Sequence, residues 1–166
     1  MDMRLNLELY EDILRIIKDK NVELRHDVDV SLSDAHYMAY IESLYGIKAF
    51  YYIRFDCDYY NAYSISNKNR IKQIESYGHT IGVHIEAHKE EDLDVLIDNY
   101  GKYWHFTFHI NNEFTKSFKK ESCHAFENKS IIKGGYVSDS RGIFNEEKFE
   151  YIKNNDNFTL VIHPEW

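Results

Sequence analysis

Short apolar runs the length of a strand alternate along this 166-residue chain with longer segments whose apolar residues recur at helical spacing. The predicted strands are residues 22–27, 47–53, 79–84, 103–110 and 158–162, with shorter ones at 122–126 and 135–139. The predicted helices are residues 5–19, 33–45, 67–77, 90–100 and 146–153. Strands that alternate with helices pair in parallel through right-handed crossovers. The order therefore predicts an α/β fold, either a barrel or an open sheet.

The composition predicts a single domain, residues 1–166. A hydrophobic content of 43% supplies a core, and no segment resembles a linker or a repeat. The formal net charge of -8 argues against a nucleic-acid partner, which needs clustered Lys and Arg. No apolar run approaches the roughly 18 residues of a membrane span, and the charged residues 1–4 are unlike a signal peptide. Cys57 and Cys123 lack CxxC spacing and are expected to be reduced thiols, so we expect a cytoplasmic protein.

Residues 25–29, with the sequence RHDVD, place two carboxylates where the first predicted strand ends. Asp27 and Asp29 are two residues apart, so on an extended backbone both side chains project from the same face. Adjacent carboxylates repel each other unless a cation lies between them, and a divalent metal is the simplest such cation. The same pair also fits a helix-capping aspartate beside a surface aspartate.

Other titratable residues stand at the ends of the later predicted strands. They are His84, His109, Asp139 and His163. Because the carboxyl ends of parallel strands meet on one face of the sheet, we expect these side chains to converge. Burying so many polar groups without partners would be costly, which favours a functional site over isolated structural residues.

Three segments resemble motifs of one enzyme family. Residues 25–29 resemble an aspartate pair, residues 78–84 (GHTIGVH) with His88 resemble a motif with two metal-binding histidines, and residues 160–166 (LVIHPEW) resemble a closing strand that carries a histidine. The family is the polysaccharide deacetylase-like superfamily, the NodB-homology carbohydrate esterases, metal-dependent enzymes that remove N- or O-linked acetyl groups from sugars. The resemblance implies a distorted (β/α) barrel of parallel strands, and an incomplete one because the chain is short for the family.

The resemblance also implies a role for each matching residue. Asp27 corresponds to the catalytic base and His163 to the general acid. The implied metal ligands are Asp29, His84 and His88. The residues expected to bind or orient the substrate or a catalytic side chain are Asp139, Arg141, His109 and Trp166.

Two departures from the family motifs leave alternatives open. The family aspartates are adjacent, whereas Val28 separates Asp27 from Asp29, so the roles of base and ligand can be exchanged between them. Glu86 follows the first metal histidine by two residues, on the same face of an extended chain, and competes with His88 as the third ligand.

A carboxylate and two imidazoles with an open position are typical of catalytic zinc sites. Zinc is therefore the expected metal, although iron, cobalt, nickel and manganese also accept these ligands. The family implies an acetylated carbohydrate as substrate: an acetylated sugar, a sugar nucleotide or a lipid-linked glycan of surface-polysaccharide metabolism. The alternative is a catalytically inactive, deacetylase-like carbohydrate-binding or scaffold protein. A metal-dependent phosphoesterase is disfavoured because the sequence has no second cluster for the paired metals of such enzymes.

Overall fold

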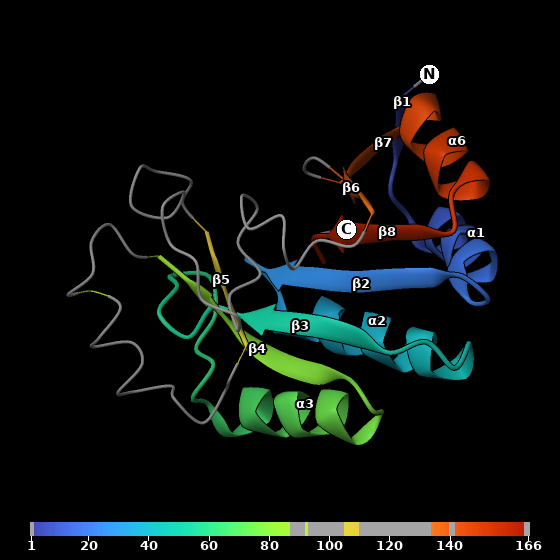
Figure 1. The fold of residues 1–166 in the computed structure, drawn as a ribbon. Coiled ribbons are helices and arrows are strands. Elements are labelled where there is room, and N and C mark those ends of the chain that lie inside the picture. The colour runs from blue at the N-terminus through green and yellow to red at the C-terminus, as the bar shows by residue number, and fades with distance from the viewer. Residues whose placement is uncertain (1, 87–91, 93–104, 110–133, 140–141, 165–166) are drawn as a thin grey trace.

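The structure is a computed structural model that describes residues 2–86, 92, 105–109, 134–139 and 142–164. Its main sheet consists of strands β2 (Asn21–Val28), β3 (Ala49–Ile53), β4 (Thr80–Ile85), β5 (Phe106–Phe108), β6 (Gly135–Ser138) and β8 (Asn157–Ile162). The strand order is β5-β4-β3-β2-β8-β6, and every neighbouring pair is parallel. The sheet curls into half a barrel (Figure 1). The prediction of a distorted, incomplete barrel of parallel strands is confirmed.

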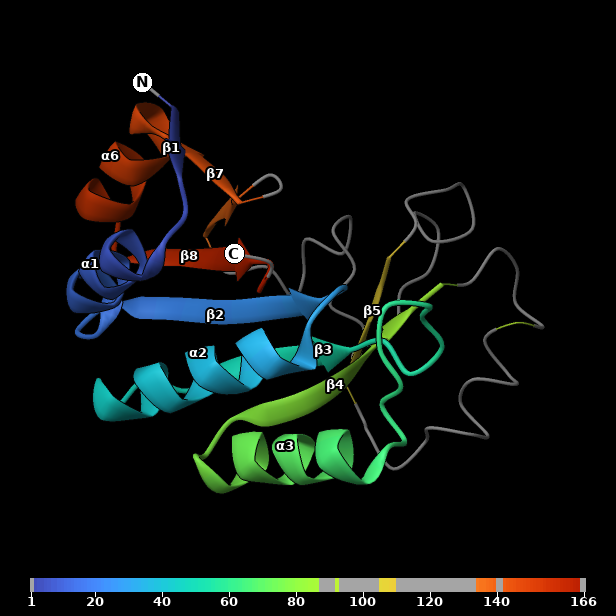
Figure 2. The same cartoon turned by 180° about the vertical axis from the view of Figure 1, so that it is seen from behind.

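The helices connect and cover these strands. They are α1 (Leu7–Ile17), α2 (Leu32–Leu44), α3 (Ile65–Ser76) and α6 (Glu146–Asn154). A Ser or Asn side chain caps the first turn of each helix by accepting a backbone N–H, and Ser64 starts α3 two residues earlier than predicted. Helices α2 and α3 lie side by side against one face of the sheet (Figure 2). No helix in the described part of the chain is both long and apolar enough to cross a membrane.

Two glycines end helices as the sequence predicts. Gly46 follows α2 with φ +71° and Gly78 follows α3 with φ +95°, a backbone conformation that favours glycine. The predicted helix 90–100, apart from residue 92, and the predicted strand 122–126 lie outside the described residues.

A second, small sheet was not predicted from the sequence. Strands β1 (Asp2–Arg4) and β7 (Ile143–Asn145) pair in antiparallel, and the backbone N–H of Leu5 donates to the Gly142 carbonyl at 2.7 Å. Each strand has three residues, too few to show an alternation in the sequence. The pairing holds the chain start beside α6, as both views of the ribbon show (Figures 1 and 2).

Strand β2 lies between β3 and β8 and presents different residues on its two faces. Leu24 and Val28 belong to the hydrophobic core, while Arg25 and Asp27 project from the opposite face of the strand. Because all six strands are parallel, their carboxyl ends lie along one edge, and the titratable residues of the sequence motifs stand at that edge.

The core also contains a polar cluster around Glu42, which is fully buried on α2. Its Oε1 atom accepts hydrogen bonds from the hydroxyls of Tyr10 and of Tyr51, the latter at 2.9 Å. The Nε2 atom of His26 lies 2.8 Å from the same oxygen. Burial, reinforced by the charge of Glu42, raises the pKa of both tyrosines, so they remain protonated donors. These donors compensate the cost of burying a carboxylate.

His79 approaches the other oxygen of Glu42, with Nδ1 3.5 Å from Oε2, but its hydrogen bonds lie elsewhere. Nδ1 accepts the backbone N–H of Ala49 at 3.1 Å, and Nε2 donates to the Ala39 carbonyl at 3.0 Å. A ring nitrogen that accepts an N–H carries no proton, so His79 is neutral and forms no ion pair with Glu42. Burial lowers the pKa of His79, in agreement with these hydrogen bonds.

Candidate functional site

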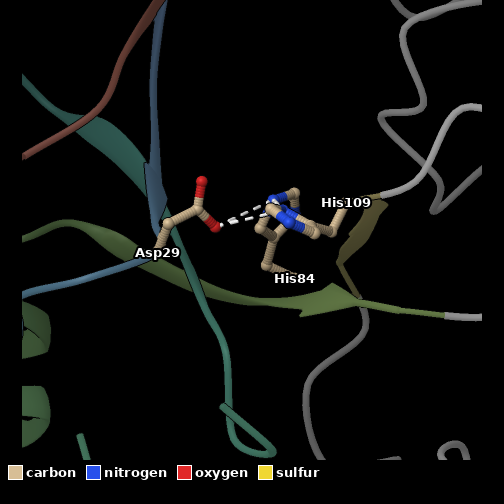
Figure 3. Close-up of side chains that lie close together, drawn as sticks. All are labelled: Asp29, His84 and His109. Carbon is tan, nitrogen blue, oxygen red and sulfur yellow. Dashed lines mark hydrogen bonds and ion pairs between the residues drawn. The ribbon is translucent and has the colours of Figure 1, made fainter. Parts of the chain in front are cut away.

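Three possible metal ligands meet at the carboxyl edge of the sheet (Figure 3). The Oδ1 atom of Asp29 lies 3.3 Å from Nε2 of His84 and 3.3 Å from Nδ1 of His109. The two nitrogens are 3.2 Å apart, and the imidazole planes are perpendicular. One oxygen and two nitrogens therefore form a nearly equilateral triangle.

The fold brings these residues together from three strands. Asp29 directly follows β2, and His84 lies in β4. The next strand, β5, pairs with β4, and the backbone N–H of His109 donates to the Ile85 carbonyl at 2.7 Å, which extends this pairing by one residue. The register pairs His84 with Thr107, so His109, two residues further on, lies on the same face of the sheet as His84.

The triangle has the size and chemistry of a divalent metal site. Zinc binds imidazole and carboxylate at about 2.0–2.1 Å, which puts the ligand atoms of a tetrahedral ion about 3.3 Å apart. Asp29 Oδ1 is buried, and among the described residues it has no hydrogen-bond partner. A buried carboxylate oxygen without such a partner is costly, and a cation would satisfy it.

The protonation states of His84 and Asp29 also suit a metal. Burial lowers the pKa of His84 to about 4, so the imidazole is neutral at pH 7 and offers a lone pair. Burial alone would raise the pKa of Asp29, but the nearby imidazoles of His109 and His84 lower it, so this carboxylate is ionised. Metals bind the deprotonated forms of both groups.

Arg25 and Asp27 form a buried ion pair beside the triangle. The guanidinium donates from Nε to Oδ1 and from Nη2 to Oδ2, both at 2.7 Å, in bidentate geometry. Burial would raise the pKa of Asp27, but the charge of Arg25 holds it well below the usual range. Asp27 Oδ2 lies 3.9 Å from Nε2 of His84, so an oriented carboxylate stands next to a candidate ligand. This role of Arg25 was not predicted from the sequence, although its position two residues before Asp27 on one strand was an available signal.

A glycine in β4 makes room for the ring that covers Arg25. The guanidinium carbon lies 5.1 Å from the ring centroid of Tyr52, within cation–π range. A Cβ atom at Gly82 would lie 2.5 Å from atoms of the same ring. The residue facing Tyr52 must therefore be glycine.

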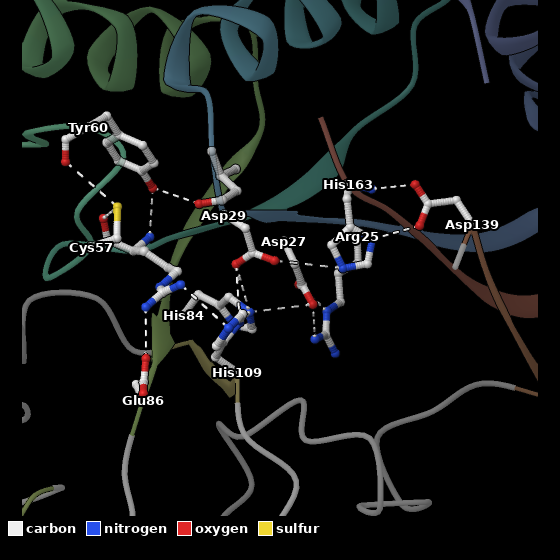
Figure 4. A network of polar contacts seen from close by, with 12 residues as sticks. Arg25, Asp27, Asp29, Cys57, Tyr60, His84, Glu86, His109, Asp139 and His163 are labelled. Atoms are coloured by element: carbon white, nitrogen blue, oxygen red, sulfur yellow. Dashed lines mark hydrogen bonds and ion pairs between the residues drawn. The ribbon is translucent and has the colours of Figure 1, made fainter. Parts of the chain in front are cut away.

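His163 and Asp139 lie on the same side of Asp29 as Arg25 and Asp27 (Figure 4). The Nδ1 atom of His163 is 2.6 Å from Asp139 Oδ1, and Nε2 is 4.0 Å from Asp29 Oδ2. Burial would lower the pKa of His163, but the hydrogen bond with Asp139 and the charge of Asp27 raise it to about 9. The imidazole is therefore protonated at pH 7 in the metal-free protein.

The structure brings most of the predicted residues into one cluster. Its predicted members are Asp27, Asp29, His84, His109, Asp139 and His163. His88, Arg141 and Trp166 lie outside the described residues.

His109 was expected to orient substrate; the structure places it beside Asp29 and His84, where it could serve as a third metal ligand. The alternative ligand Glu86 instead pairs with Arg54 at 2.8 Å. The position of His109, near the end of a predicted strand next to the one that bears His84, was the signal in the sequence.

Comparisons with known proteins give little beyond this geometry. No protein-family model and no curated protein matches the chain. Among solved structures, the chain is similar to a family 4 carbohydrate esterase from Bacillus anthracis, with 14% sequence identity and a TM-score of 0.39. The match covers 99% of this chain and 82% of that one. At this distance the likeness assigns no activity.

Proposed function

We propose that the protein is a metal-dependent hydrolase that removes N- or O-linked acetyl groups from a carbohydrate. The observation that carries the proposal is the triangle of Asp29, His84 and His109, with an oriented carboxylate, Asp27, next to His84 and a protonated imidazole, His163, next to Asp29. A metal site with a base and an acid beside it suits the hydrolysis of an amide or ester. The resemblance of three sequence segments to the polysaccharide deacetylase-like superfamily supports the same reaction.

Asp29, His84 and His109 would hold the metal. When bound, a divalent ion supplies a Lewis acid that polarises a carbonyl and makes water more acidic. The donor set fits zinc, and iron, cobalt, nickel and manganese accept the same ligands.

Asp27 is the proposed general base. Its carboxylate accepts two hydrogen bonds from Arg25, which fix its orientation and keep it ionised. As water adds to the acetyl carbonyl carbon, Asp27 takes the proton that the water loses. Arg25 acts on this step only through Asp27 and is a positioning residue.

His163 is the proposed general acid. Asp139 accepts a hydrogen bond from its Nδ1 atom, so the proton to be transferred is held on Nε2, which faces Asp29. When the bond between the acetyl carbon and the sugar nitrogen or oxygen breaks, His163 gives this proton to the departing amine or hydroxyl. The products are acetate and the deacetylated sugar.

The proposed substrate is an acetylated sugar, a sugar nucleotide or a lipid-linked glycan of surface-polysaccharide metabolism. For a cytoplasmic protein, the last two are the forms in which such sugars occur before export.

The test is acetate release by the metal-loaded protein. Purified protein, loaded in turn with zinc, cobalt and nickel, is incubated with N-acetylated and O-acetylated oligosaccharides, an acetylated sugar nucleotide and a lipid-linked acetylated glycan. We expect acetate from at least one of them, and none from an Asp29→Ala, His84→Ala double variant. If the protein binds metal but releases acetate from none of these substrates, the proposed hydrolase function is wrong. If it then still binds an acetylated sugar, the alternative of a carbohydrate-binding protein is favoured.

A further inference from the structure

The loop after β3 contains a tyrosine whose hydroxyl lies between two strands of the sheet. Tyr60 Oη accepts the backbone N–H of Arg54 at 2.9 Å and donates to the carbonyl of Val28 at 2.7 Å. Arg54 directly follows β3, and Val28 is the last residue of β2. The hydroxyl therefore connects the carboxyl ends of two neighbouring strands.

This hydroxyl takes the place of a direct bond between the strands. The register pairs Val28 with Ile53, and the next bond of a regular parallel ladder would join the Arg54 N–H to the Val28 carbonyl. Two hydrogen bonds through Tyr60 replace that single bond. Strands β2 and β3 are thereby held apart by one oxygen atom at the edge where the metal ligands stand.

The separation bears on the metal ligand that comes next in the chain. The Val28 carbonyl belongs to the same peptide plane as the nitrogen of Asp29, so the bond from Tyr60 fixes the direction in which β2 continues into Asp29. Figure 4 shows Tyr60 beside Asp29, on the side away from His163. A direct ladder bond would draw this peptide toward β3, the side on which β4 and β5 bear the two imidazoles, and so change the place of the carboxylate relative to them.

The same loop contacts a second ligand. Arg54 Nη1 lies 3.4 Å from Nε2 of His109, and the guanidinium is held by Glu86 at 2.8 Å. The thiol of Cys57 closes the loop by donating to the carbonyls of Arg54 and Tyr60 at 3.8 and 3.7 Å. The loop from Arg54 to Tyr60 thus contacts or adjoins two ligands on different strands.

We propose that Tyr60 is a positioning residue of the metal centre, whose hydroxyl separates β2 from β3 and thereby sets the place of Asp29 relative to the two histidines. Burial raises the pKa of Tyr60, so the hydroxyl keeps its proton and serves as both donor and acceptor. The proposal rests on the metal centre of the proposed function, but its test needs no substrate and no turnover.

The test compares Tyr60→Phe with Tyr59→Phe. The first variant removes only the bridging hydroxyl, while Tyr59 is 69% exposed and serves as the matched control. Cobalt affinity is measured by competition with a chelator, and the visible absorption of bound cobalt reports the ligand geometry. We expect Tyr60→Phe to bind cobalt about 10- to 100-fold more weakly, with an altered spectrum, and Tyr59→Phe to match the wild type.

A second measurement on the wild-type protein covers the case in which Tyr60→Phe does not fold. If breaking the two hydrogen bonds of the Tyr60 hydroxyl displaces Asp29, a metal bound to Asp29 must make this breaking less favourable. Zinc at 100 times its dissociation constant should then slow hydrogen exchange of the Arg54 amide by up to about 100-fold. The Gly46 amide, which bonds to Ser43 at the far end of α2, should change less.

The outcomes separate this inference from the proposed function. Wild-type affinity and spectrum in Tyr60→Phe would overturn the inference and leave the hydrolase intact. If zinc slows hydrogen exchange equally at the Arg54 and Gly46 amides, the proposed role of Tyr60 is also wrong, and the hydrolase proposal is unaffected. A wild-type protein that binds no metal would overturn both.

Discussion

The carboxylate of Asp139 holds His163 at two points. Oδ1 lies 2.6 Å from the ring atom Nδ1, and Oδ2 accepts the backbone N–H of the same residue at 2.9 Å. Asp139 is fully buried and follows β6, while His163 follows β8. The bonds fix both the ring and the backbone of the imidazole that faces Asp29, so its orientation does not depend on bound substrate.

We therefore expect Asp139→Asn to lower the pKa of His163. Burial lowers that pKa, but the hydrogen bond to Asp139 and the charges of Asp27, Asp139 and Asp29 together raise it to about 9 in the metal-free protein; without the Asp139 carboxylate, burial should weigh more and lower it. An NMR titration of the His163 ring in metal-free protein measures this. Asp12→Asn, which changes an exposed acid on α1, is the control. An unchanged titration in Asp139→Asn would contradict the assignment.

The same pKa shift predicts how stability depends on pH. Because the pKa of His163 is raised above the unfolded value of about 6.5, its contribution to the unfolding free energy is complete below pH 6.5. It is lost as the pH rises through 9. Urea unfolding of the metal-free protein from pH 6.5 to 9 should show this decline in the wild type and less of it in Asp139→Asn.

The identity of the third ligand is tested by three alanine variants. If the geometry of the described residues is that of the metal centre, His109→Ala should weaken metal binding by several kcal/mol, and Glu86→Ala and His88→Ala should change it little. Competition with a chelator gives each affinity, and elemental analysis should find about one equivalent in the wild type. A strong loss in His88→Ala with none in His109→Ala would restore the assignment made from the motif.

Asp27→Asn and His163→Ala should separate proton transfer from metal binding. Neither residue belongs to the triangle, so both variants should keep the metal. Each should lower the turnover of an acetylated sugar by roughly 10²–10⁴-fold. If Asp27→Asn instead releases the metal while Asp29→Asn keeps it, the two aspartates have exchanged roles. This result would not contradict the proposed hydrolase function.

His79→Gln should make stability less dependent on pH at the acidic end. Burial, which exceeds the opposing charge of Glu42, lowers the pKa of His79 below the unfolded value of about 6.5. Only the unfolded chain then takes up a proton just below pH 6.5, so the unfolding free energy falls with the pH. Urea unfolding between pH 7 and 5 should show a shallower slope in the variant. An equal slope would mean that His79 takes up its proton as readily in the folded protein as in the unfolded chain.

Periodicity was enough to predict most of the fold. The strand ending at Asp27 and the helix ending at Gly46 stand close to where the sequence placed them, because each has one face or both in the core. The pairing of β1 with β7 could not be predicted, since its short strands are joined by contacts between distant parts of the chain.

The sequence predicted which site residues stand at the ends of strands, but not how their side chains are arranged. Asp29 and His84 were predicted as ligands because both stand in segments that resemble family motifs. The proposed ligand role of His109 depends on the register between β4 and β5, and the role of Arg25 as the partner of Asp27 depends on side-chain conformation. Neither register nor conformation can be read from one sequence.

The cluster around Glu42 has a consequence for the way this sequence can change over time. Tyr10, Tyr51 and His26 all converge on a single carboxylate oxygen, so replacing Glu42 alone would leave two tyrosine hydroxyls without this acceptor and His26 without this neighbour inside the core. Apolar substitutions at these positions are tolerable only together. An alignment of related chains should therefore show the four residues inherited or exchanged as one block, with intermediate combinations rare.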